Sequence, residues 1–163
     1  MNISFNWLKN YVDTTLTAEE ISKVLTDIGL EVEGFEKIET IRGGLAGVVV
    51  GEVLTCEEHP DSDHLWVCRL DAGKKHGHDV QIVTGAQNVN QGDLVPAALH
   101  NSWLPGGIHI TKGKLRGVKS NGMLCGLEEL GLTLNDFPNA ILDGIWILND
   151  EDCKIGDDIN KVI

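Results

Sequence analysis

The stretch KGKLRGVKSNGMLCGLEELGL, residues 112–132, joins a run of basic residues to an apolar segment and two glutamates. Its first eight residues carry four basic side chains and no acidic one: Lys112, Lys114, Arg116 and Lys119. The first three of these alternate, so they would share one face of a β-strand, and we predict that a single strand over residues 109–115 carries this basic block. Cations about 7 Å apart along a strand can follow a phosphate backbone. A solvated strand face is the alternative that the pattern leaves open.

The composition of the chain limits what this basic stretch can do. The 163 residues carry a formal net charge of −12, and the sequence pI is about 4.7. Dedicated nucleic-acid-binding proteins are usually basic over the whole domain. Residues 41–150 hold eight basic and thirteen acidic residues, a balance of −5, and half of the eight lie between residues 112 and 119. Any contact with RNA must therefore be local.

The N-terminal segment is predicted to be a small α/β lobe. Ser4 can cap a short first helix. Thr17 and Glu20 form a capping box for a second helix, in which each side chain accepts a hydrogen bond from the backbone N–H of the other residue. Gly29 ends this helix, and the apolar residues that follow predict a strand over residues 30–35. Two helices and one strand bury too little to fold alone, so the lobe needs a partner.

From residue 46 onward, short apolar runs alternate with polar turns. We predict strands at residues 46–54, 65–70, 80–83, 94–99 and 109–115, and a further strand at 144–148. Short strands with long polar loops are typical of a small closed barrel. The predicted fold class is mainly β, with an α+β N-terminal lobe and a five-stranded β-barrel of the OB type.

No motif in the chain predicts catalysis or metal binding. We find no Gly-rich phosphate loop and no nucleophile paired with a base. The spacing of Cys56, His59, His64 and Cys68 resembles a zinc knuckle, but the segment has its own strand pattern, which places the two cysteines toward a barrel interior. We therefore predict no catalytic and no metal-binding residue, and we expect a reduced, cytoplasmic protein without a membrane segment.

Three blocks of the sequence resemble the EMAP-II-like family of tRNA-binding domains. They are HPDSDHLWVC at residues 59–68, QIVTGAQNV at 81–89 and LRGVKSNGMLCGLEELGL at 115–132, and they stand in the family's order. The runs ISFNWLKNYV at residues 3–12 and GLEVE at 29–33 resemble the start of bacterial phenylalanyl-tRNA synthetase beta chains. Together these blocks extend the resemblance over essentially the whole chain.

The resemblance implies three parts and a parent enzyme. Residues 1–40 would be the first half of a split N-terminal domain, residues 41–150 the OB domain, and residues 151–163 the truncated start of the returning segment. The parent would attach phenylalanine to its tRNA with ATP and magnesium, as a heterotetramer of two alpha and two beta chains. The fragment itself would hold no cofactor and have no activity of its own. Its partners would be phenylalanine-specific tRNA and the synthetase alpha chain.

The basic pattern and the resemblance together indicate one RNA-binding set: Lys112, Lys114, Arg116, Lys119, Ser120, Asn121 and Asn88. At two positions the sequence departs from the family pattern and has a residue less suited to binding RNA. Gly126 stands in place of a Ser, and His64 stands in place of an Arg. Trp66 and Trp103 are the candidates for stacking bases in the barrel.

Two alternatives to this tRNA-binding module stay open. One is a structural module that assembles the synthetase without touching RNA, which the acidic net charge favours. The other is a free-standing tRNA-binding protein, which the N-terminal lobe disfavours.

Overall fold

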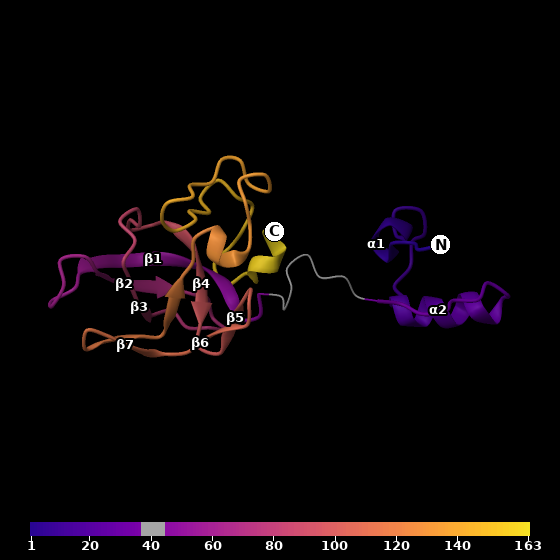
Figure 1. Cartoon of the computed structure of the whole chain (residues 1–163), viewed down its shortest axis with the longest axis horizontal. Coiled ribbons are helices and arrows are strands. Elements are labelled where there is room, and N and C mark those ends of the chain that lie inside the picture. Colours follow the sequence, from indigo (N-terminus) through magenta and orange to yellow (C-terminus); the bar gives the residue numbers. More distant parts are fainter. Residues whose placement is uncertain (37–44) are drawn as a thin grey trace. The chain divides into compact units, whose positions relative to one another are not determined.

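The computed structural model describes residues 1–36 and 45–163 (Figure 1). The chain divides into two compact units, Met1–Ile38 and Glu39–Ile163. The domain boundary predicted between residues 40 and 41 lies outside the described residues. Within the described ranges, no helix combines the length and the apolar character needed to cross a membrane.

The first unit contains two helices, α1 (Phe5–Leu8) and α2 (Ala18–Asp27). Both predicted caps are confirmed. The Ser4 hydroxyl accepts from the Trp7 N–H at 3.3 Å. The Thr17 N–H donates to the Glu20 carboxylate at 2.8 Å, and the Glu20 N–H donates to the Thr17 hydroxyl at 3.2 Å. Gly29, with a φ of +101°, follows the end of α2 as predicted.

The strand predicted over residues 30–35 is wrong. These residues are irregular, and the described part of this unit contains no other strand with which their backbone could pair. No described residue of the unit is buried. The exposed fraction is 53% for Trp7, 70% for Ile28 and 62% for Phe35. The unit therefore presents an apolar surface without a core of its own.

The second unit is built on an antiparallel sheet that curls into a nearly closed barrel (Figure 1). Its strands, in spatial order, are β3 (Val80–Thr84), β2 (Trp66–Asp71), β1 (Val48–Glu58), β4 (Leu94–Leu99) and β9 (Gly122–Leu124). A register shift between Val53 and Thr55 marks an irregularity in β1. The ends of the sheet meet where the Asn121 N–H donates to the Gln81 carbonyl at 2.8 Å. The predicted OB-type barrel is confirmed.

Two hairpins stand between β4 and β9. They pair β5 (Ser102–Leu104) with β6 (Ile108–Ile110), and β7 (Gly113–Leu115) with β8 (Val118–Ser120). The single strand predicted over residues 109–115 is therefore wrong. The break falls at Thr111 and Lys112, where the Lys112 N–H donates to the His100 ring at 3.1 Å instead of continuing a ladder.

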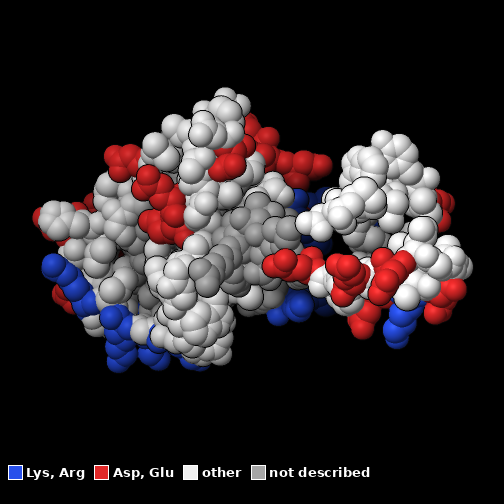
Figure 2. Space-filling view, turned by 45° about the vertical axis from the view of Figure 1, so that its right-hand side comes forward, with Lys and Arg blue, Asp and Glu red and all other residues white. Residues whose placement is uncertain are grey.

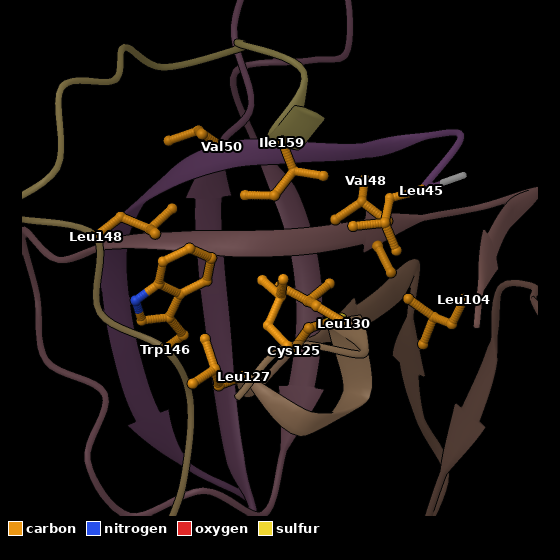
Figure 3. Close-up of a cluster of buried hydrophobic side chains, with 12 residues drawn as sticks. Leu45, Val48, Val50, Leu104, Cys125, Leu127, Leu130, Trp146, Leu148 and Ile159 are labelled. Carbon is orange, nitrogen blue, oxygen red and sulfur yellow. The ribbon is translucent and has the colours of Figure 1, made fainter. Parts of the chain in front are cut away.

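Two hydrophobic clusters fill the second unit. The larger one surrounds the indole of Trp146, which lies among Leu127, Leu148 and Ile159 (Figure 3). The other is formed mainly by side chains of the five strands of the sheet and includes Ile82, which is fully buried. Residues 144–148 do not form the predicted strand, although the Leu148 N–H still donates to the Leu94 carbonyl at 2.7 Å. Packing of the Trp146 side chain and single hydrogen bonds, such as that from the Trp146 N–H to the Cys125 carbonyl at 3.2 Å, hold this segment in place of a regular ladder.

The C-terminal segment packs on the barrel. The Val50 N–H donates to the Asp157 carbonyl, and the Gly156 N–H donates to the Val50 carbonyl, both at 2.8 Å. Two short 3-10 helices, η1 (Glu128–Leu130) and η2 (Ile159–Lys161), each bury one apolar side chain. That residues 151–163 begin a segment returning to the first domain stays a prediction.

Candidate nucleic-acid interface

The hairpin of β7 and β8 has a backbone turn that places an arginine at its tip. The turn residues are Arg116 and Gly117, with φ values of +49° and +85°. Two-residue hairpin turns of type I′ require a positive φ at both positions. Glycine adopts this conformation freely, but it is uncommon for arginine. Such a residue in a sparsely populated conformation is a pointer toward function.

Exposed cations gather on this hairpin, which contains no Asp or Glu, while the Arg116 guanidinium donates to the Asp61 backbone carbonyl at 3.5 Å. Lys114 and Lys119 stand directly opposite each other across the two strands, so their side chains share one face. Residues 94–127 contain no Asp or Glu. None of the four predicted basic residues forms an ion pair with another described residue. Because opposed like charges destabilise a hairpin, the arrangement favours binding of an external anion.

The charge distribution over the barrel unit is uneven (Figure 2). Lys and Arg side chains gather along its lower edge in this view, and Asp and Glu side chains gather over its upper part. The chain as a whole is acidic, with a net charge of −12. The positive region is therefore a local one, as the composition requires.

His59 connects the loop after β1 to the hairpin tip. Its side chain is buried, and its Nε2 lies 2.9 Å from the Leu115 carbonyl. Its Nδ1 accepts from the Asp61 N–H at 2.9 Å, so in the neutral ring the proton is on Nε2 and donates to Leu115. His59 thereby fixes the residue before Arg116. The sequence suggested only a turn here, because the contact joins residues 56 positions apart.

Ser120 is the last residue of β8, and Asn121 connects it to β9. The Ser120 hydroxyl is buried, accepts from the Val83 N–H at 3.0 Å and donates to the Gly122 carbonyl at 2.8 Å. These two bonds occupy the hydroxyl within the barrel. The side-chain amide of Asn121, in contrast, has no hydrogen-bond partner among the residues that the structure describes. Of this pair, Asn121 is the residue with polar atoms to offer a ligand.

Asn88 lies in the loop between β3 and β4. Its Nδ2 donates to the Ile145 carbonyl at 2.8 Å, and its Oδ1 accepts from the Ile145 N–H at 2.9 Å. A Cβ at Gly144 would overlap the Asn88 side chain, so glycine is needed there. The structure thus brings the four basic residues together on one segment, and it places Asn88 and Ser120 in the framework of the barrel.

The cysteines of the barrel are buried or half-buried thiols. Cys56 and Cys68 face each other across β1 and β2, with their Sγ atoms 3.3 Å apart. Burial raises the pKa of Cys68, and it raises the pKa of Cys125 to about 12. Among the described residues, no three or more His, Cys, Asp or Glu side chains form a group that could hold a metal ion.

Known proteins resemble the barrel unit and the chain as a whole. The family model described as a putative tRNA binding domain matches residues 48–143. The chain is 45% identical over 163 residues to the phenylalanine–tRNA ligase beta subunit of Clostridium acetobutylicum, covering 100% of the chain and 19% of that relative. It is 51% identical over 135 residues to the same subunit of Bacteroides thetaiotaomicron, covering 81% of the chain and 16% of that relative.

Among solved structures, an RNA ligase of Naegleria gruberi superposes on 73% of the chain and 34% of its own length, with a TM-score of 0.47 and 15% identity. The chain spans less than a fifth of the length of the two curated relatives above. The matched residues 48–143 contain all three blocks quoted from the sequence, so the predicted resemblance is confirmed. The chain matches one segment of a phenylalanine–tRNA ligase beta subunit, and it belongs to the family of tRNA-binding domains.

Proposed function

We propose that this chain docks tRNA for a phenylalanine–tRNA ligase, as part of the beta subunit, through phosphate contacts of the β7–β8 hairpin. The carrying observation is the cluster of four exposed cations on an acid-free segment of an acidic chain. Phosphate oxygens receive most of the hydrogen bonds and ion pairs that proteins make to nucleic acids. The match to a tRNA-binding family supports tRNA as the source of those phosphates.

The residues of the hairpin have separate roles in this proposal. Lys114 and Lys119 bind neighbouring phosphates from one face, and Lys112 extends this row. Arg116 at the tip offers a planar group that can bind a phosphate through two hydrogen bonds. The Asn121 amide adds a polar contact at the base of the hairpin. Ser120 and Asn88 position this surface through the barrel bonds that already engage them.

For the whole protein, we propose the activity that is stated in the names of its relatives. A ligase of two alpha and two beta chains would attach phenylalanine to its tRNA in the cytoplasm, with ATP and magnesium. The identity of 45% and 51% to beta subunits of phenylalanine–tRNA ligases supports the ligase activity. We propose no ATP, magnesium or catalytic site in these 163 residues.

The first unit is, in our proposal, one half of a split domain that other sequence completes. Its exposed Trp7, Ile28 and Phe35 support this assignment, because together they form apolar surface that the unit does not bury.

The test is tRNA binding over a salt series by two charge-matched variants. Lys114→Gln/Lys119→Gln removes two charges from the hairpin, and Lys74→Gln/Lys75→Gln removes two from exposed positions between β2 and β3. Each phosphate-bound cation contributes about 0.7 to 0.9 to the slope of log affinity against log salt. We expect the hairpin variant to lose about 1.4 to 1.8 units of slope and the loop variant to keep the wild-type slope. Equal slopes would contradict the hairpin site, and no wild-type binding at low salt would favour the assembly role.

A further inference from the structure

The β5–β6 hairpin carries a ring pair that the proposed phosphate contacts do not use. Trp103 of β5 and His109 of β6 stand opposite each other in register. Their ring centroids are 4.3 Å apart, and the ring planes lie within 9° of parallel. The Trp103 residue keeps 44% of its surface exposed, and His109 is also exposed. The two rings therefore form a parallel stack at the surface.

The barrel core does not account for this exposed indole. The neighbours of Trp103 on the same strand, Ser102 and Leu104, are buried, as the alternation of a strand requires. A cross-strand ring pair contributes to the stability of a hairpin. That contribution needs contact between the two rings, and the 44% of Trp103 that stays exposed is available to a third ring.

Trp103 differs from the other tryptophans of this unit. Trp146 is 1% exposed and belongs to the core. Trp66 is half-buried, and its Nε1–H donates to the Gln87 side chain at 3.2 Å. Within residues 45–163, Trp103 is therefore the indole that presents an exposed face to a ligand.

The ring pair adjoins the basic hairpin. Only Thr111 and Lys112 separate β6 from β7, and the two strands follow each other along one edge of the barrel in Figure 1. The Lys112 N–H donates to the His100 ring, and the Asn101 N–H donates to the Ile110 carbonyl at 2.8 Å. These bonds hold Lys112 next to the start of the β5–β6 hairpin. An RNA strand bound at Lys112 has its next bases within reach of the ring pair.

We infer that Trp103 and His109 form a stacking platform for an unpaired nucleobase of the RNA whose phosphates the β7–β8 hairpin binds. The inference rests on the proposed function. Aromatic side chains stack on any base, and one stacked base strengthens binding about 5- to 150-fold. The chain then prefers RNA in which single-stranded nucleotides adjoin a helix over a continuous duplex.

The test uses two RNA stem-loops that differ only in bases. One carries a single-stranded 3′ adenosine extension, and the other carries an equal number of abasic residues, so both hold the same phosphates. We expect the 163-residue wild-type chain to bind the adenosine form about 5- to 150-fold more tightly. Trp103→Ala should bind both forms equally, at the affinity of the abasic form. Trp66→Ala is the matched control and should keep the wild-type preference.

A second readout separates stacking from loss of fold. The ¹⁵N-labelled indole N–H signal of Trp103, assigned by its absence in Trp103→Phe, should shift with the adenosine RNA and not with the abasic RNA. Equal binding of both RNAs by wild type overturns the platform and leaves the proposed function standing. A preference that persists in Trp103→Ala also overturns it. Failure of wild type to bind either RNA overturns both proposals together.

Discussion

In the helical first unit no described residue is buried, whereas the barrel unit holds Trp146 at 1% exposure and Leu127, Leu148 and Ile159 at 0%. The helices depend on contacts three or four residues apart, such as the capping box. The barrel depends on contacts between distant segments, such as the bond from Asn121 to Gln81. Correct local structure therefore does not by itself provide a core. Stability should therefore reside in the barrel, and changes in the two units should have unequal effects.

Removal of the Trp146 indole should destabilise the protein most. Trp146→Ala deletes a side chain packed among Leu127, Leu148 and Phe137, with ring centroids of Trp146 and Phe137 4.5 Å apart. We expect the free energy of unfolding of the barrel to fall by about 3 to 5 kcal/mol. Denaturant unfolding followed by far-UV circular dichroism measures it. Trp7→Ala, at a position 53% exposed, should leave the barrel transition unchanged, and equal losses in the two variants would contradict the comparison.

The next largest effect is expected where the last strand passes close to β4. A Cβ at Gly122 would overlap the carbonyl oxygen of Ala98, a backbone atom that cannot move without shifting the strand. We expect Gly122→Ala to lower the free energy of unfolding by about 2 to 3 kcal/mol. Gly113→Ala is the control, because no atom lies within 4 Å of its Cβ position. Chemical denaturation of both variants decides the point, and a stable Gly122→Ala protein would show that this approach is not tight.

The sequence predicts those parts of the molecule whose signals are local. The capping box of α2 and the alternating strands β1 to β4 lie close to where the residue pattern placed them. The sequence does not predict the break of the 109–115 strand at Lys112, because this break depends on the His100 ring twelve residues earlier. The strand predicted at residues 144–148 does not form, since the backbone bonds of this segment go to separate partners and not to one ladder, and the Trp146 side chain packs in the core.

The candidate site divides in the same way. The four basic residues are recognisable from charge alone, because an acid-free run is visible in the sequence. The role of His59 is not recognisable, since its partner Leu115 is brought near only by folding. Ser120 and Asn88 show the converse, because their residue types suit RNA contact while their polar atoms bind the barrel.

A smaller effect is expected in the first unit. Thr17→Ala removes the hydroxyl that accepts from the Glu20 N–H, and loss of such a cap costs about 1 kcal/mol of helix stability. We expect the ¹³Cα chemical shifts of α2 to move toward random-coil values while those of the barrel strands stay fixed. Thr15→Ala, at an exposed position outside the capping box, is the control. A change in the barrel shifts would mean that the two units are not independent in stability.

The same capping box makes the start of α2 sensitive to acid. The Glu20 carboxylate accepts from the Thr17 N–H, and this bond lowers the pKa of Glu20. A carboxyl group with a lower pKa in the folded than in the unfolded chain stabilises the fold above its unfolded pKa, and the contribution is lost as the pH falls through the folded value. Between about pH 6 and about pH 3, the α2 shifts of wild type should therefore move toward random coil. Glu20→Gln keeps an oxygen acceptor without this carboxylate, so its first-turn shifts should change less than those of wild type over this range, the neighbouring Glu19 being kept. An identical pH profile in the variant would assign the acid response to other groups.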